Sequence, residues 1–590
     1  MEALSSLLPP EIAATFFHAF LLDISMAAYL LVVPAIAFVI SMLSRWKLVE
    51  LKWLSYYINT LVVLFSIISI FNFNIYREWG TKINAKALDV AITTPNEALA
   101  SGASSPVGFS LLVLVLLMSL GVVLQRYLVL KKLIFKKSSI WIRLPIAILI
   151  LGLNFVLIRG GIAGSPINQS MAYFSKSQVL NLASVNTEWN LLSSLIAANK
   201  TKSNPYLYEN AKEANALISN LYAVDKDSTI SVLTMKRPNI VIFLMESFTA
   251  DLTATLGNMK DVTPGFDSLT HQGILFSNIY STGNRTDKGF IATLAGFPTL
   301  AAVNIVKWPE KTEKLPSISR SLNKVGYHNT FYYGGESEFD NYKAFLLSHD
   351  VHKLTDRNNF DGGDVTSWGQ FDGAVFNRQL NETQNATQPF FTTILTLTNH
   401  EPFAVPGNPR FGSANNVDKF KSTAYYTDSC ITSYLKEAKK QPWYKNTLFL
   451  FIADHGHIYP KNRTDVFVPE RYHIPFLMYG EVIKNEFKGR VFDGVGSQAD
   501  VPATLLAQLQ LNPQEFKWSK NLLNPNVKPF AFFSWDNGMG FIDNQQCVTF
   551  DNTGKVILYN NLSSDAGKTA ATLKLAKSYL QVVYEAFLNL

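Results

Sequence analysis

The chain has 590 residues, of which 48% are hydrophobic and 16% charged, and its mean hydropathy is +0.10. This length predicts several folding units, and the composition excludes a disordered chain, which would be polar and highly charged. It also argues against an entirely soluble enzyme, in which about a quarter of the residues are charged. The two cysteines, Cys430 and Cys547, exclude a disulfide scaffold or a cysteine-rich zinc module. The net charge of +7 does not indicate a nucleic-acid partner, because much of it lies in two short loops.

Four long apolar runs predict transmembrane helices in the first quarter of the chain. Each run is close to the roughly 20 residues that a helix needs to cross a bilayer, and together they cover residues 24–43, 54–76, 107–124 and 140–158. The loops after the first and third runs are basic, and cytoplasmic loops favour lysine and arginine. Their basic residues are Arg45, Lys47 and Lys52, and then Arg126, Lys131, Lys132, Lys136 and Lys137. We therefore expect everything after Ile158 to lie outside the cytoplasm.

A shorter apolar run, Leu7–Leu22, precedes these four and contains Pro9, Pro10 and Glu11. It lacks the basic start and the small-residue cleavage site of a signal peptide. We interpret it as an interfacial helix or as the remnant of a further span.

The rest of the chain predicts a helical connector, 159–236, a catalytic α/β domain, 237–520, and a C-terminal subdomain, 521–590. Amphipathic patterns predict connector helices over Ser177–Ala198 and Tyr208–Tyr222. Buried strands are predicted at Asn239–Met245, Phe391–Leu397, Thr447–Ala453 and Ile474–Tyr479, and helices at Ser317–Val325, Thr423–Lys440 and Val501–Leu509. Strands that alternate with helices predict a mostly parallel sheet with helices on both faces.

Ionisable residues follow three of the predicted strands. Glu246 follows the first, His400 lies just beyond the second, and Asp454 and His455 follow the third. Ligands of open α/β sheets bind beyond the carboxyl ends of the strands. Carboxylate and imidazole groups without a thiolate suit a divalent ion such as Mn, Mg or Zn.

A candidate nucleophile lies in the segment STGNRTDKG, which leads into the apolar helical pattern Phe290–Ala295. Thr286 is therefore expected at or just before a helix N-terminus, where backbone N–H groups favour an anion. The alternative interpretation is that Thr286 only caps the helix.

These motifs resemble the lipoteichoic acid synthase-like phosphoglycerol transferases of the alkaline phosphatase and sulfatase superfamily. The resemblance rests on the order and spacing of membrane spans, connector, PNIVIFLMESF, TGNRTDKGF, YHNTFYYGGESEFDN, TLTNHEPF, FIADHGH and YHIPF. It implies an α-helical transmembrane domain followed by an extracytoplasmic α/β domain of the alkaline phosphatase/sulfatase type.

The resemblance also implies site residues. One metal, usually manganese, with Mg or Zn as alternatives, would be held by Glu246, Thr286, Asp454 and His455, with Thr286 as the nucleophile. His400 would lie beside the phosphoryl group. We further expect Arg285 and Lys288 to add positive charge or to be merely solvated, and His457 and His473 to support the site from behind. We expect His473 to be a hydrogen bonder at the strand edge rather than a ligand of a second metal ion.

One segment departs from the Gram-positive synthases, which have a Trp and an Arg after the strand that corresponds to Thr330–Tyr333. This chain has Gly334–Asn341 there, as in the Gram-negative branch of the family. Asp340 and Asn341 are expected to bind a glycerol hydroxyl. Alternatively, the acids of this segment, which are Glu336, Glu338 and Asp340, face an ammonium group.

The expected function is transfer of phosphoglycerol from phosphatidylglycerol, through a threonine intermediate, to an envelope glycan or glycerolphosphate acceptor. The protein is expected in the bacterial cytoplasmic (inner) membrane with its catalytic domain on the periplasmic side, and with no nucleic-acid partner. A phosphoethanolamine transferase of the same fold is the alternative, although such enzymes typically carry several disulfides. A sulfatase is disfavoured because the C/S-x-P-x-R motif is missing, and a non-catalytic sensor because the candidate site residues are all present.

Overall fold

The computed structural model describes residues 9–44, 51–79, 82–85, 87–88, 107–128, 138–162, 166–175, 177–198, 203–224, 226, 228–301, 303–363, 365–536, 538–562 and 564–590. The chain divides into two compact units, Met1–Lys202 and Ser203–Leu590. The predicted connector, 159–236, is thus divided between the two units. Lys136 and most other residues of the two basic loops lie outside the described residues.

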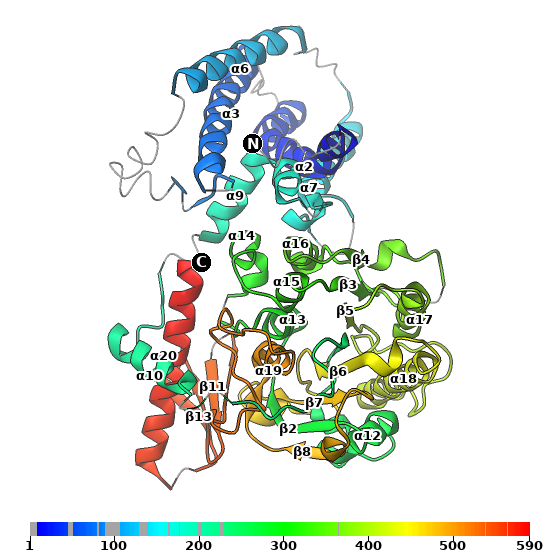
Figure 1. Ribbon diagram of the computed structural model, residues 1–590. Coiled ribbons are helices and arrows are strands. Elements are labelled where there is room, and N and C mark those ends of the chain that lie inside the picture. Colours follow the sequence, from blue (N-terminus) through cyan, green and yellow to red (C-terminus); the bar gives the residue numbers. More distant parts are fainter. Residues whose placement is uncertain are drawn as a thin grey trace. The chain divides into compact units, whose positions relative to one another are not determined.

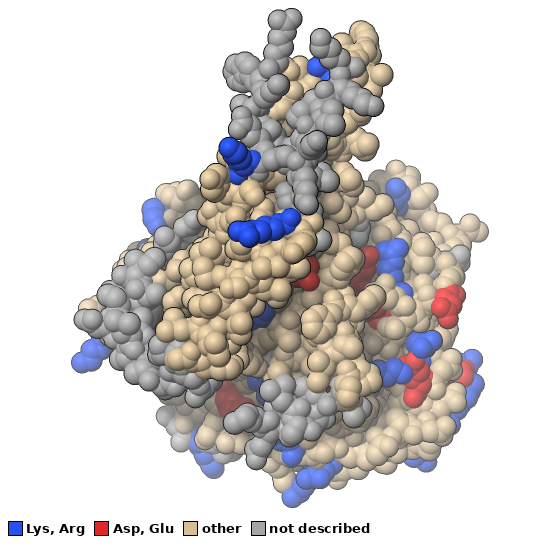
Figure 2. Space-filling view, turned by 90° about the horizontal axis from the view of Figure 1, so that it is seen from above, with Lys and Arg blue, Asp and Glu red and all other residues tan. Residues whose placement is uncertain are grey.

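The N-terminal unit contains the apolar helices. Among the described residues, four helices are long and apolar enough to cross a membrane: α2 (Pro9–Leu43), α3 (Leu51–Trp79), α6 (Val107–Leu128) and α7 (Ile140–Arg159). Large apolar side chains such as Phe17, Trp141 and Leu149 are mostly exposed on them. Figure 2 shows wide stretches of the described surface that carry neither Lys or Arg nor Asp or Glu. The many large apolar side chains exposed on these helices are what lipid-facing helices require.

Two predictions for this unit are wrong in detail. The short run at Leu7–Leu22 is not a separate helix, because residues 9–43 form one continuous helix. Pro9 and Pro10 lie in its first turn, where a missing N–H leaves no intrahelical bond unmade. The helix predicted over Ser177–Ala198 is two helices, α8 (Gln178–Ser184) and α9 (Thr187–Ala198). Asn186 separates them, because its side chain accepts a hydrogen bond from the backbone N–H of Trp189 (2.8 Å) and so starts a new helix.

The second unit is built around a nine-stranded sheet of order β4-β3-β5-β1-β6-β7-β2-β8, with β9 paired to β2. The strands are β1 (Asn239–Met245), β2 (Ile274–Tyr280), β3 (His328–Tyr333), β4 (Lys353–Thr355), β5 (Phe390–Leu395), β6 (Thr447–Ala453), β7 (His473–Tyr479), β8 (Arg490–Phe492) and β9 (Gly496–Ser497). All pairs are parallel except those that β7 makes with β6 and β2. The mostly parallel sheet is therefore confirmed, with β7 as a reversed strand.

Helices cover both faces of this sheet (Figure 1). One layer contains α12 (Pro264–Thr270), α17 (Asp372–Thr383) and α18 (Asn416–Ala438), and the other contains α13 (Thr286–Ala295), α15 (Ile318–Asn323), α16 (Tyr342–Ser348) and α19 (Val501–Gln508). Phe243 of β1 packs against Phe376 and Tyr434 in the first layer, with ring centroids 5.2 and 5.1 Å away. Phe331 of β3 contacts Phe290 of α13 in the second. The central strands are apolar throughout because both of their faces are buried.

A second sheet, which is antiparallel, lies near the C-terminal end of the chain. Its four strands are β10 (Phe530–Trp535), β11 (Gly538–Asp543), β12 (Cys547–Asp551) and β13 (Val556–Asn560), followed by α20 (Ala566–Asn589). Helix α10 (Ala211–Tyr222) packs beside α20, and the hydroxyls of Tyr222 and Tyr579 lie 2.6 Å apart. Tyr579 also stacks on Phe532 of β10, with ring centroids 4.3 Å apart. Side chains from both ends of this unit thus share one core.

Candidate metal centre and active site

Three side chains at the ends of neighbouring strands converge on one point. Glu246 directly follows β1, and Asp454 and His455 directly follow β6. Because β1 and β6 are adjacent and parallel, their carboxyl ends meet at the same edge of the sheet. One ligand atom from each residue lies within 4.8 Å of the others, and all three residues are buried. We call Glu246, Asp454 and His455 the acidic cluster.

Hydrogen bonds orient the acidic cluster and leave some of its ligand atoms open. Asp454 Oδ1 accepts from the backbone N–H of Ser247 (2.7 Å) and of His455 (2.6 Å), while its Oδ2 is buried without a partner among the described residues. His455 Nδ1 donates to the carbonyl of Gly456 (2.7 Å), because a carbonyl can only accept. Nε2 of the neutral ring therefore carries the lone pair, 3.7 Å from carboxylate oxygens of Glu246 and Asp454.

The electrostatics of the cluster favour a bound cation. Burial, and then the neighbouring Glu246, raise the pKa of Asp454 well above its usual value. Burial lowers the pKa of His455, which keeps the imidazole neutral and able to bind a metal. Two buried carboxylates this close cannot both be ionised unless a positive charge compensates them. The orphaned Oδ2 of Asp454 and the open Nε2 of His455 thus fit a divalent ion bound by oxygen and nitrogen.

Thr286 joins this cluster from the first turn of α13. Its Oγ1 donates a hydrogen bond to Glu246 Oε2 (2.9 Å). Arg285 occupies the N-cap position with an extended backbone, and no side chain caps the helix there. Gly289 permits this approach, because a Cβ at that position would lie 1.8 Å from the carbonyl oxygen of Asp454. The hydroxyl of Thr286 is therefore directed to the acidic cluster and does not cap its own helix.

The predicted substrate-binding residues lie in different settings. Arg285 is exposed and forms no ion pair with the described residues. Lys288 is buried, its Nζ lies 3.3 Å from Asn284 Oδ1 and 3.6 Å from Asp536 Oδ1, and burial lowers its pKa. Asn341 is also buried, and one N–H of its amide donates to the carbonyl of Val306 (3.3 Å).

The acids of the Gly334–Asn341 segment have cationic partners in the protein. Asp340 lies 3.7 Å from Lys307, Glu338 lies 3.0 Å from Lys343, and Glu336 lies 3.6 Å from Arg357. Asp340 and Asn341 both have positive φ, 49° and 60°, a strained conformation for residues with a side chain. These ion pairs neutralise the three carboxylates with which an ammonium headgroup would otherwise pair.

His400 follows β5, and its ring packs against Trp368, a contact that the sequence did not predict. Its Nδ1 is 2.9 Å from the carbonyl of Glu401, so Nδ1 donates and Nε2 is the nitrogen left open. Trp368 lies against the His400 ring, with centroids 4.3 Å apart, and its indole N–H donates to the same carbonyl (2.8 Å). Phe339 contacts Trp368 from the Gly334–Asn341 segment. A lone tryptophan in a glycine-rich loop gave no signal in the sequence that could place it here.

His457 and His473 are separated from the acidic cluster by their packing. His457 stacks on Phe420 (4.4 Å), its Nδ1 accepts from the backbone N–H of Tyr459, and burial lowers its pKa to about 3. His473 Nε2 lies 2.7 Å from the carbonyl of Ser277, in the neighbouring strand β2. Both imidazoles thus have partners within the fold.

Residues 238–511 match the model of the sulfatase family. Among curated proteins, the chain is similar to the "lipoteichoic acid synthase-like YvgJ" of Bacillus subtilis, with 23% identity over 53% of this chain and 54% of the relative. It is 28% identical to the lipoteichoic acid synthase of Staphylococcus aureus over 37% of this chain and 36% of that protein. The chain spans about half the length of the first of these relatives, and less of the second.

Two solved structures share the fold of the second unit. One is a protein of the alkaline phosphatase superfamily from Vibrio parahaemolyticus, with 24% identity, a TM-score of 0.55, and coverage of 65% of this chain and 97% of that one. The other is the lipoteichoic acid synthase LtaP from Listeria monocytogenes, with 18% identity, a TM-score of 0.53, and coverage of 64% and 98%. The second unit thus has the fold of these two structures and is similar in sequence to the sulfatase family, as the motifs predicted.

Proposed function

We propose that this protein is a membrane-bound phosphoglycerol transferase that uses Thr286 as its nucleophile. The observation that carries the proposal is the hydrogen bond from Thr286 Oγ1 to Glu246 inside the buried acidic cluster. A threonine hydroxyl is a weak nucleophile until a base or a cation activates it, and this cluster offers both a carboxylate and a cation site. Relatives named lipoteichoic acid synthase support the phosphoglycerol group as the cargo.

The residues divide the reaction into two displacements at phosphorus. Thr286 Oγ1 forms a P–O bond while the bond to the diacylglycerol oxygen breaks, and the Thr286 proton passes to Glu246. His400 Nε2, when protonated, donates its proton to the leaving alkoxide. An acceptor hydroxyl then gives its proton to His400 Nε2 and displaces Thr286 Oγ1, which takes back the proton held by Glu246. A divalent ion held by Glu246, Thr286, Asp454 and His455, with manganese as our first choice, would supply the positive charge that offsets the phosphoryl oxygens.

The apolar helices fit a donor that resides in a membrane. Phosphatidylglycerol is the proposed donor, and an envelope glycan or a glycerolphosphate chain is the proposed acceptor. The domain would work outside the bacterial cytoplasmic membrane, on the periplasmic side, as the basic loops indicate. The boundaries 237–520 and 521–590 remain our proposal for the catalytic domain and its C-terminal subdomain.

The structure offers little support for the alternative, a phosphoethanolamine transferase. Its ammonium headgroup needs unpaired carboxylates, yet Glu336, Glu338 and Asp340 each have a basic partner. Such enzymes also typically carry several disulfides, whereas Cys430 and Cys547 are both free thiols.

The function is tested by incubating the purified full chain with manganese and vesicles that contain either phosphatidylglycerol or phosphatidylethanolamine. We expect diacylglycerol release from phosphatidylglycerol alone. Release from phosphatidylethanolamine alone would contradict the assignment and favour the alternative.

Replacement of His400 by alanine tests its role as the acid. We expect His400→Ala to slow diacylglycerol release by roughly 100-fold or more, since general acid catalysis contributes this much. A donor with a nitrophenol leaving group needs no proton, so the loss should be much smaller with that donor. Trp368→Phe, which keeps an aromatic support beneath the ring, is the control and should retain most activity. Equal losses on both donors would instead make His400 a phosphate-binding residue.

Two single cysteines on either side of α7 test the membrane orientation. In a background without Cys430 and Cys547, Ile162→Cys should react with a membrane-impermeant maleimide on intact spheroplasts. Ser138→Cys, next to the second basic loop, should react only after the membrane is permeabilised. Both positions are exposed in the structure, so access within the protein is matched. The reverse labelling would place the active site in the cytoplasm.

A further inference from the structure

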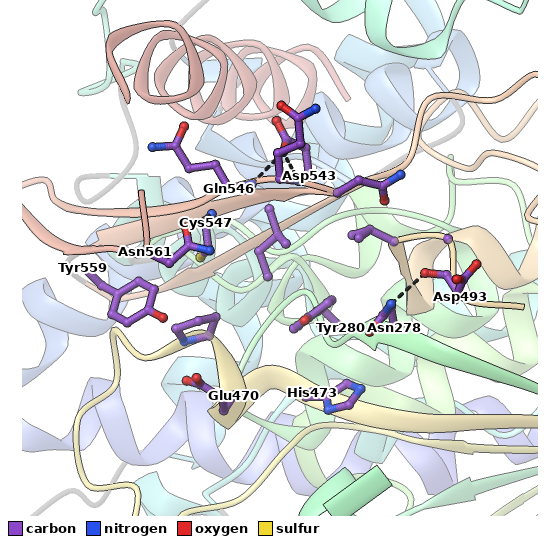
Figure 3. Close-up of a pocket in the computed structure, with 16 residues that line it drawn as sticks. Asn278, Tyr280, Glu470, His473, Asp493, Asp543, Gln546, Cys547, Tyr559 and Asn561 are labelled. Atoms are coloured by element: carbon purple, nitrogen blue, oxygen red, sulfur yellow. Dashed lines mark hydrogen bonds between the residues drawn. The ribbon is translucent and has the colours of Figure 1, made fainter. Parts of the chain in front are cut away.

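A cavity apart from the acidic cluster lies between the two sheets of the second unit (Figure 3). We call it the second cavity. It has a volume of about 540 Å³, within the roughly 300–1,000 Å³ of small-ligand sites. One side of the cavity is formed by the end of β2 and the start of β7. The opposite side is formed by the turn between β11 and β12. Neither Thr286 nor the acidic cluster lines it, so it is a separate site.

The lining is polar, and among the described residues that form it there is no lysine or arginine. Most of it consists of amides, carboxylates and two tyrosines, beside His473 and the less polar Pro469, Gly494, Val495, Ile542 and Cys547: Asn278, Asn544, Gln545, Gln546 and Asn561; Glu470, Asp493 and Asp543; Tyr280 and Tyr559. Phosphate binding uses cationic side chains or free backbone N–H groups at a helix N-terminus. A lining rich in acids and amides is therefore unsuited to an anionic polymer and suited to hydroxyl groups, which both donate and accept.

Several groups in the cavity have no partner in the protein. Among the described residues, no hydrogen bond joins the hydroxyl of Tyr280 or of Tyr559 to another group, and the carboxylate of Glu470 forms neither a hydrogen bond nor an ion pair. These side chains lie around one common space (Figure 3). Burial raises the pKa of Tyr280 to about 12, so its hydroxyl remains a donor. Both rings are half-buried, and each offers an apolar face together with a polar tip.

The cavity shares an edge of the large sheet with the acidic cluster. β7 runs antiparallel to β6 and β2, so the start of β7, at His473, and the end of β2, at Tyr280, lie at the same edge as Asp454. Two strand spacings, about 10 Å, separate the ends of β2 and β6. From Tyr280 the chain continues through Ser281–Arg285 directly to Thr286. A ligand that occupies the cavity and also reaches Thr286 must therefore span at least this distance of about 10 Å.

We propose that this cavity is the acceptor subsite and that it binds a neutral oligosaccharide. One sugar unit would lie against the faces of Tyr280 and Tyr559, with its hydroxyls bonded to the carboxylate of Glu470 and the amide of Asn544. A neighbouring unit would extend along the sheet edge and present a hydroxyl to Thr286. This inference rests on the proposed transfer function, and it selects a glycan over a glycerolphosphate chain as the acceptor.

Direct binding tests the cavity independently of catalysis. The purified full chain, in detergent and in the Thr286→Ala form, is titrated with a panel of neutral oligosaccharides of hexoses and N-acetylhexosamines, with glycerolphosphate oligomers, and with calcium. We expect saturable binding of at least one neutral oligosaccharide. Tyr559→Ala should weaken this binding roughly tenfold, and Tyr559→Phe, which keeps the ring, should weaken it less. Binding of glycerolphosphate or calcium alone, no binding at all, or unchanged affinity in Tyr559→Ala would overturn the proposal.

The two half-reactions separate this inference from the proposed function. In the otherwise native chain, and without an acceptor, Tyr559→Ala and Glu470→Ala should leave the first turnover of diacylglycerol release from phosphatidylglycerol within about twofold of the native rate, because the acceptor takes no part in that step. The same variants should raise the KM for the oligosaccharide that binds best roughly tenfold. If the native chain releases no diacylglycerol, the proposed function fails, while saccharide binding at the cavity still stands or falls by the titration. An unchanged KM in both variants would contradict the acceptor role.

Discussion

Thr286→Ala is expected to abolish phosphoglycerol transfer, with a loss of roughly 10,000-fold or more, as for removal of other enzyme nucleophiles. The variant lacks the only hydroxyl that the structure directs to Glu246 from α13. It should still fold, because Thr286 is only half-buried and alanine favours a helix. Diacylglycerol release and transfer, measured with phosphatidylglycerol vesicles, check the prediction.

The matched control for this variant is Thr286→Ser, which keeps a hydroxyl at the same position. Serine should retain a measurable fraction of the native rate, while both variants should bind manganese within about tenfold of the native affinity, because Glu246, Asp454 and His455 remain. A native turnover rate in Thr286→Ala would show that Thr286 is not the nucleophile.

Asp454→Asn is expected to lower transfer by roughly 1,000-fold or more and to remove metal-dependent stabilisation. The native chain should gain about 2.7 kcal/mol in free energy of unfolding when free manganese is 100 times its Kd. The variant lacks the charged Oδ2 that is buried without a protein partner, so its gain should be close to zero. Without metal the variant should be at least as stable as the native chain, because it removes one of two facing buried carboxylates. Thermal unfolding with manganese and with a chelator measures both effects.

His457→Ala is the comparison for Asp454→Asn. His457 is stacked on Phe420 and bonded to the Tyr459 backbone, so its loss should lower the melting temperature but reduce activity less than about tenfold. Metal-dependent stabilisation should persist. Equal activity losses in the two variants would make His457 a ligand, and a second ion would have to be considered.

Much of the fold was predictable because its signals are local. Asn239–Met245 and Thr447–Ala453 are continuous apolar runs, and both are central strands with the predicted bounds. The residues after them converge because parallel strands end at one edge. This rule alone predicts that Glu246, Asp454 and His455 lie close together.

Other features depend on contacts distant in sequence and were missed. The reversed direction of β7 is set by its pairing with β2, about 200 residues earlier, and Ile474–Tyr479 alone carries no sign of it. Asn341 was predicted to bind substrate, yet its amide reaches the carbonyl of Val306, because a left-handed backbone turns the side chain inward. Trp368 reaches His400 only through the fold. The antiparallel β10–β13 sheet was not predicted either, although it forms one wall of the second cavity.

The central claim is that Thr286 carries the transferred group. The most direct test is mass spectrometry of the purified full chain after brief exposure to phosphatidylglycerol with manganese and without an acceptor, followed by peptide mapping. The account predicts an added mass of one phosphoglycerol unit, located on Thr286 and missing in Thr286→Ala. Diacylglycerol release with the added group on another residue, or with no covalent adduct under any quench condition, would contradict it.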